Sequence, residues 1–263
     1  MFIFTSYESL LIKRFLFSKK SDGFVSIFSW ISIIGIMIGV AAIIIVMGVM
    51  NGFREELTDR LLGINGHLNI YSSNNEINKY EYNFLIDKNT KYIISPSTQT
   101  QALIISDNKS KGVVLRGYDN KNLYPNHFLK KKIIKGSMFQ DNLQDVVIGY
   151  ALANQLNSNI GDKIKIAIPK TDRTIFGNIP RFKTLKITGI FDLGMYEYDS
   201  NFIFTHQSIA NKLLLINNGN HNQIEIFIEN PQLIENTQNK INNIIKKNNL
   251  PLYTSSWKQN NAA

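Results

Sequence analysis

The most prominent feature of the pattern along the chain is a long apolar run near the N-terminus. No charged residue occurs between Asp22 and Arg54. A membrane-spanning helix needs about 20 apolar residues, so this run is long enough to cross a bilayer and continue beyond it. Two alternatives remain. One is a buried helix of a soluble protein, and the other is a cleaved signal peptide, whose apolar region covers only about 7–15 residues.

Helical spacing gives the run and its flanks distinct faces. Small residues at three- and four-residue spacing predict a face that packs against another helix: Ser32, Gly35, Gly39 and Ala42. A later apolar stripe, with charged residues on the other faces, predicts that the helix continues as a stalk: Met50, Phe53, Leu57 and Leu61. Upstream, an apolar face predicts a short interfacial helix: Tyr7, Leu10, Leu11 and Phe15.

From about Gly63 the pattern changes to short alternating segments, which are typical of strands. Residues 145–156 predict a strand that enters a helix, and 74–82 predict a loop. Further helices are expected at 206–215 and 231–247. Strands are expected at 67–71, 91–96, 101–106, 111–117, 163–168, 184–191, 201–205 and 223–228. Because strands and helices mix without a regular βαβ repeat, we predict an α+β fold.

The pattern therefore divides the chain into four parts. Residues 1–22 form an N-terminal segment with the interfacial helix, and 23–62 form the spanning helix and stalk. Residues 63–256 form the α+β domain, which 257–263 follow.

One connection in this domain is unusually long. Residues 169–183 join two predicted strands, whereas hairpin loops usually have 2–5 residues and long loops are often functional. The loop carries Phe176, Ile179 and Phe182, with Gly177 and Pro180 shaping its backbone. Exposed apolar side chains either fold back onto the domain or meet a partner, and the sequence leaves both possibilities open.

The charge pattern orients the span. Lys13, Arg14, Lys19 and Lys20 precede it, whereas basic and acidic residues are mixed after it. The positive-inside rule therefore predicts a cytoplasmic N-terminus and a periplasmic main domain. The formal net charge is +9, but the lysines are scattered and form no basic block with interleaved aromatics. We therefore expect no nucleic-acid partner.

Residue chemistry gives no sign of catalysis. The chain has no cysteine, no phosphate-binding loop, no nucleophile elbow and no H-E-x-x-H motif. Its four histidines, at positions 67, 127, 206 and 221, are far apart in sequence. We expect no catalytic residue, metal site or cofactor, and therefore a protein that is not an enzyme.

Several strings resemble the lipoprotein-releasing ABC transporter permeases of the LolC/LolE family, which belongs to the wider MacB-like exporter class. The most specific is VMGVMNGFREEL at 46–57 within the similar segment 24–62. Others are LRGYD (115–119), GYALANQL followed by GDKIKI (149–166), LKITGIF (185–191) and the late Trp257. The similarity covers nearly the whole chain.

The resemblance implies an outer α+β domain in two lobes and an inner-membrane location. It makes 169–183 similar to the hook of LolC, which implies that Phe176, Gly177, Ile179, Pro180 and Phe182 bind a LolA-like periplasmic carrier. It also implies a LolD-like ATPase subunit, a LolE-like partner or a second permease copy, a lipoprotein substrate and contact with membrane lipid.

The chain departs from the family in one respect. Family members carry three more spans after the outer domain, whereas this sequence stops shortly after Trp257. We therefore expect the N-terminal part of a permease, with 257–263 starting the return to a second span. Two alternatives remain: another MacB-like permease that exports a peptide or controls a cell-wall hydrolase, and a complete bitopic scaffold or sensor.

Overall fold

The structure, a computed structural model, describes residues 6–16, 23–88, 92–106, 109–119, 129–139, 144–174, 177–217 and 219–260. The chain forms two compact units, Met1–Asp59 and Arg60–Ala263. We refer to the second as the outer unit.

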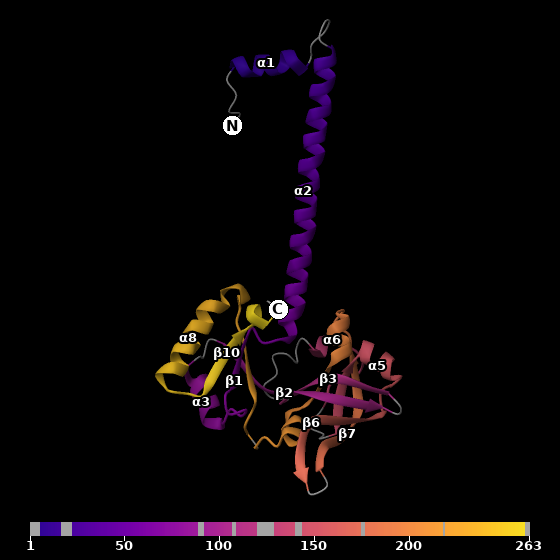
Figure 1. Ribbon diagram of the computed structural model, residues 1–263, viewed down its shortest axis with the longest axis vertical. Coiled ribbons are helices and arrows are strands. Elements are labelled where there is room, and N and C mark those ends of the chain that lie inside the picture. Colours follow the sequence, from indigo (N-terminus) through magenta and orange to yellow (C-terminus); the bar gives the residue numbers. More distant parts are fainter. Residues whose placement is uncertain are drawn as a thin grey trace. The chain divides into compact units, whose positions relative to one another are not determined.

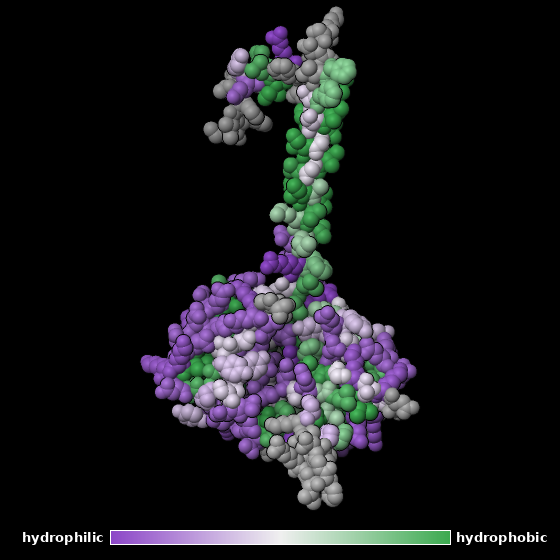
Figure 2. Space-filling model, viewed as in Figure 1, coloured by the Kyte–Doolittle hydropathy of each residue, from purple (hydrophilic) through white to green (hydrophobic). Residues whose placement is uncertain are grey.

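The first unit contains α1 (Ser6–Leu16) and most of α2 (Gly23–Ile64), a helix of 42 residues. The segment Ile27–Ile64 is long and apolar enough to cross a membrane, with a mean hydropathy of 2.9 in its most apolar window. None of that window is buried in the protein, and Figure 2 shows apolar side chains over most of the helix surface. Such a surface suits a lipid environment, because lipid tails would cover it.

The outer unit is built on a ten-stranded sheet with the order β10-β1-β9-β2-β3-β8-β5-β7-β4, and β6 pairs with β2 and β7 (Figure 1). The β3–β8 and β5–β7 pairs are parallel and the others are antiparallel. The strands are β1 (Leu68–Ser72), β2 (Ile93–Ser106), β3 (Lys109–Tyr118), β4 (Ile133–Gly136), β5 (Asp145–Gly149), β6 (Lys163–Thr174), β7 (Gly177–Phe191), β8 (Phe202–His206), β9 (Gln223–Phe227) and β10 (Leu252–Ser256). The helices are α3 (Lys79–Lys88), α5 (Tyr150–Leu156), α6 (Tyr196–Asn201), α7 (Gln207–Leu214), the 3-10 helix η1 (Pro231–Leu233), α8 (Ile234–Lys247) and α9 (Trp257–Asn260). This mixture confirms the α+β class.

Two hydrophobic cores divide the sheet into two lobes. In the first lobe, α3 and α8 bury side chains such as Leu85 and Ile241 against β1, β9 and β10. In the second, α5 and α7 bury Leu152 and Ile209 against β2, β3 and β5 to β8. Strand β2 belongs to both lobes, since its first half pairs with β9 and its second half with β6.

Two connections differ from the sequence prediction. Segments 91–96 and 101–106 are not separate strands, because β2 runs unbroken from Ile93 to Ser106. Polar groups in its middle bond distant side chains: the Gln99 backbone bonds the Asn222 side chain, and the Thr98 hydroxyl bonds Asn211 Oδ1. The predicted loop 74–82 contains the start of α3. Asn78 and Glu81 each accept the other's backbone N–H at 2.9 Å, which is a reciprocal cap.

The segment 169–183 is also not a loop. Strand β6 continues to Thr174 and β7 begins at Gly177, so the two strands form one long hairpin. Pro180 and Gly177 lie opposite Thr171 and Thr174, and a register shift between Ile168 and Thr171 accommodates Pro169. Strands β4 and β10 and helix α6 were not predicted.

Candidate functional site: a projecting hairpin and the end of α2

The outer half of the β6–β7 hairpin extends beyond the sheet. Strand β6 pairs with β2 only through Lys165–Ala167, and β7 pairs with β5 and β4 only from Lys186 onward. Within the described chain, residues 168–174 and 177–181 therefore pair only with each other. We call this two-stranded ribbon the arm (Figure 1). A ribbon without a third strand gains little stability from its own pairing, so the arm is a feature that the core does not require.

The base of the arm has one anchored face and one exposed face. On the anchored face Ile168 is buried in the core, and Arg181 Nη1 donates to the Leu213 carbonyl at 3.0 Å. On the other face the Phe182 ring is 46% exposed, and Lys165 Nζ lies 4.7 Å from its centroid. The base thus presents an aromatic ring and a positive charge together.

An apolar groove of about 540 Å³ adjoins the exposed face. Its lining includes Leu103, Val114, Ala167, Pro169 and Pro180. Cross-strand pairing brings these residues together, since Leu103 lies opposite Ala167 and Ala167 lies opposite Phe182. The arm and the groove therefore form one continuous surface at this edge of the outer unit.

The predicted hook residues fall into three groups. Phe176 lies outside the described residues. Gly177 and Ile179 belong to β7, and at these two positions the structure describes the backbone only. Pro180 and Phe182 are exposed at the base of the arm. The structure thus places Pro180 and Phe182 in the exposed part of β7. A role for Phe176, Gly177 and Ile179 in binding a partner stays a prediction.

The residues predicted for helix packing and for the stalk all lie on α2. Ser32, Gly35, Gly39 and Ala42 are exposed, and a Cβ added at Gly35 or Gly39 would meet no atom within 4 Å. Met50 and Phe53 are likewise exposed, whereas Leu57 and Leu61 are half-buried. The small-residue face is therefore open to a second helix, which stays a prediction.

Sequence reasoning missed the polar cluster that holds the end of α2. The Arg116 guanidinium donates to the Ile64 carbonyl at 3.2 Å, to Asn65 Oδ1 at 2.7 Å and to Gln99 Oε1 at 2.7 Å. It also lies 4.8 Å from the Phe202 ring centroid. A cation at a helix C-terminus is favourable because the last carbonyls carry partial negative charge. Arg116 therefore joins α2 to strands β2 and β8.

A buried carboxylate extends this cluster into the first lobe. Glu225 is fully buried and accepts a hydrogen bond from the Tyr118 hydroxyl at 3.0 Å. Burial raises the pKa of Glu225, although the nearby Arg116 charge and the Tyr118 hydrogen bond oppose this shift. Burial and the neighbouring Glu225 also raise the pKa of Tyr118. The only sequence signal for the cluster was a lone arginine inside the apolar strand VVLRGY.

Comparison with known proteins gives consistent matches. Residues 29–244 match the family described as MacB-like periplasmic core domain. The lipoprotein-releasing system transmembrane protein LolC of Neisseria meningitidis serogroup B is 30% identical over 212 residues, which are 76% of this chain and 49% of that protein. The same protein from Xylella fastidiosa strain Temecula1 is 26% identical over 207 residues, with the same coverage. The chain thus spans about half the length of these relatives.

Among solved structures, the extracellular domain of the noncanonic ABC-type transporter YknZ from Gram-positive bacteria matches with a TM-score of 0.49 and 10% identity. The match covers 72% of this chain and 99% of that domain.

Proposed function

The chain belongs to the MacB-like periplasmic core domain family, and from this we propose that it is a permease subunit of an ABC transporter that extracts lipoproteins from the inner membrane and passes them to a periplasmic carrier. The matches to LolC confirm the resemblance to the lipoprotein-releasing permeases. They cover about half of those proteins, so the activity of the whole assembly belongs to the proposal.

The observation that carries the proposal is the arm. A ribbon that the core does not need, next to an apolar groove and the exposed Phe182, is a surface suited to a protein partner. We assign the arm, including positions 177 and 179, together with Phe176, to binding of a LolA-like carrier. This assignment requires the outer unit to face the periplasm and the N-terminus to lie in the cytoplasm.

The proposed mechanism needs no covalent chemistry in this chain. A separate LolD-like subunit hydrolyses ATP, and a LolE-like subunit or a second permease packs against the small-residue face of α2. Because α2 is one continuous helix into the outer unit, it can transmit movement to the point where Arg116 donates to its last carbonyl, that of Ile64. The outer unit then presents the released lipoprotein to the carrier on the arm.

Carrier titration tests this proposal. The full chain in lipid nanodiscs is titrated with the LolA-like carrier, and its affinity is compared with that of the Phe176→Ala/Ile179→Ala variant. Burial of one such side chain contributes about 1.5–3 kcal/mol, so the variant should bind at least about tenfold more weakly.

The matched control is Leu233→Ala, which truncates an apolar side chain that is 55% exposed on η1, away from the arm. It should leave the affinity unchanged. Equal carrier affinity of the arm variant and the unmodified chain would remove the assignment of the arm.

A further inference from the structure

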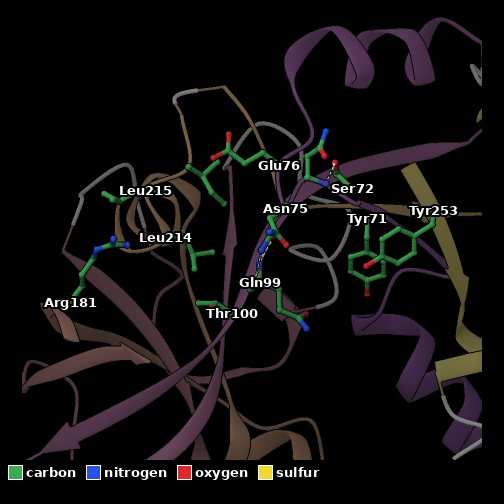
Figure 3. A pocket seen from close by; sticks show the side chains of 13 residues that line it. Tyr71, Ser72, Asn75, Glu76, Gln99, Thr100, Arg181, Leu214, Leu215 and Tyr253 are labelled. Carbon is green, nitrogen blue, oxygen red and sulfur yellow. Dashed lines mark hydrogen bonds between the residues drawn. The ribbon is translucent and has the colours of Figure 1, made fainter. Parts of the chain in front are cut away.

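A polar cleft of about 480 Å³ opens in the outer unit where the sheet divides into its two lobes. Figure 3 shows Arg181 at one end, the Tyr71 and Tyr253 rings at the other, and Asn75 and Gln99 between them. Its lining comes from β1, β2, β7 and β10 and from the segments that follow β1 and α7. The cleft is therefore elongated and belongs to both lobes.

The sheet has a gap in its pairing at this place. On one edge of β2, β9 pairs through Ser97 and β6 pairs from Leu103 onward. Among the described residues, no strand pairs with that edge between Thr98 and Ala102. The Asn222 side chain fills one position, because it accepts from Gln99 N at 2.9 Å and donates to Gln99 O at 2.7 Å. A side-chain amide thus occupies the position beside β2 where a neighbouring strand's peptide group would otherwise lie.

The cleft offers hydrogen-bonding groups held in a defined turn. Asn74 N donates to Ser72 Oγ and Asn75 N donates to Ser72 O, both at 3.2 Å. The side-chain amides of Asn74 and Asn75 are exposed and, among the residues that the structure describes, have no hydrogen-bond partner. The turn therefore presents donors and acceptors to the cleft without first having to be ordered.

An aromatic platform closes one end. The Tyr71 and Tyr253 rings are stacked with centroids 5.4 Å apart, and Tyr253 is 53% exposed. Tyrosine combined with serine and asparagine is the composition that protein-binding loops use, since tyrosine gives rigid amphipathic area and the small polar residues give adaptable hydrogen bonds.

The charges narrow the ligand class. The lining holds one cation, Arg181, and one carboxylate, Glu76. A phosphate-rich ligand would need a cluster of cations, and the polar lining does not suit an acyl chain. An uncharged, elongated ligand with repeated amide groups fits all of these features.

We propose that this cleft binds an extended, uncharged polypeptide segment of the exported lipoprotein, an inference that rests on the proposed function. The segment lies across the cleft, with its peptide groups near Asn74 and Asn75 and a side chain against Tyr253. The cleft would thereby hold the protein part of the substrate at a site that meets the arm at Arg181.

Peptide binding by the full chain in nanodiscs tests the proposal. The ligand used is a fluorescently labelled, acetylated and amidated peptide of Gly, Ser, Asn and Thr without an acyl chain. About six residues suffice, which span roughly 20 Å when extended. We expect saturable binding that weakens at least about tenfold in Tyr253→Ser/Asn74→Ala. Tyr80→Ser, which changes a tyrosine that is 71% exposed on α3 outside the cleft, should have no effect.

If Tyr253→Ser lowers the melting temperature, Asn74→Ala/Asn75→Gly leaves β10 intact and replaces the positive-φ residue Asn75 by one that accepts this backbone. Absence of saturable binding, or binding equal in both cleft variants and the unmodified chain, overturns the proposal. So does selective binding of an N-acetylglucosamine oligosaccharide that these variants abolish. If these outcomes occur while the same samples still bind the carrier, the cleft proposal fails and the proposed function of the arm does not.

Discussion

At the residue scale, the structure depends on charged groups that are buried with their partners. Arg116 is 6% exposed and donates to three acceptors on two segments, the end of α2 at Ile64 and Asn65 and the middle of β2 at Gln99. A buried ion is tolerated only when its partners are in place, because its loss of hydration is costly. The arginine therefore fixes how the helix end, β2 and β8 meet.

Replacement of Arg116 by methionine keeps much of the volume but leaves these acceptors and Glu225 without the guanidinium. Loss of one member of such a buried cluster costs about 3–5 kcal/mol, or roughly 6–20 °C in melting temperature for a domain of this size. Thermal melting in detergent micelles measures the change. Arg54→Met, at an exposed position on α2, serves as control and should melt like the unmodified chain; equal melting of both variants would contradict the role of Arg116.

Asp199 predicts a dependence on pH. Burial raises its pKa to about 6, with Asp192 adding to the shift and the backbone N–H groups of Leu193 and Met195 opposing it. The folded state therefore binds this proton more tightly than the unfolded state. Its contribution to stability is fully present below about pH 4 and is lost as the pH rises through about 6.

The melting temperature of the unmodified chain minus that of Asp199→Asn should thus be larger at about pH 4 than at about pH 8. Comparing the two melting temperatures at each pH cancels the contribution of His221, which is present in both proteins. Burial lowers the pKa of His221 to about 4, so its effect on stability has the opposite pH dependence. A difference that is constant across this range would show that Asp199 does not titrate there.

At the element scale, amphipathic helices follow the sequence pattern closely. Residues 231–247 predicted a helix, and α8 buries Ile234, Ile241 and Ile245 in the first lobe. Ile244, on the neighbouring face, is only half-buried. Ile241 and Ile244 are thus the same residue type on one helix, but only Ile241 is fully buried in the core.

This pair makes a matched test. Ile241→Ala should lower the free energy of unfolding by about 2–5 kcal/mol, the range for truncating a buried isoleucine. Ile244→Ala should cost clearly less, since part of its side chain already contacts solvent. Denaturant unfolding followed by circular dichroism compares the two variants, and similar losses would mean that α8 packs with a different face.

The sequence predicted regular elements where the period of apolar residues was clean, as in KIKIAI (163–168) and 145–156. It failed where polar residues are satisfied by distant partners. The middle of β2 read as a turn because Asn222 and Asn211, which bond it, are more than a hundred positions away. Gly177 and Pro180 suggested a loop, although both lie in β7 of the hairpin. Nothing in the sequence linked Arg116 with Asn65. The Asn78–Glu81 cap was also missed, since 74–82 was predicted as a loop, although a cap residue followed three positions later by glutamate is typical of a helix start.

At the scale of the whole molecule, one helix that suits a membrane leads into a two-lobed unit that carries an arm and a cleft. The basic residues before the span favour a cytoplasmic N-terminus, and the proposed function requires the arm to lie in the periplasm. In the proposed function, the arm and the cleft act on different partners, the carrier and the exported polypeptide.

Site-specific photo-cross-linking in intact cells tests the central claim most directly, since it requires the orientation, the arm and the carrier together. A photoreactive phenylalanine is incorporated at Ile179 in one variant and at Tyr80 in another, in cells that also produce the LolA-like carrier. The account predicts a covalent adduct with the carrier from position 179 and none from position 80. No adduct from either position, or equal adducts from both, would contradict it.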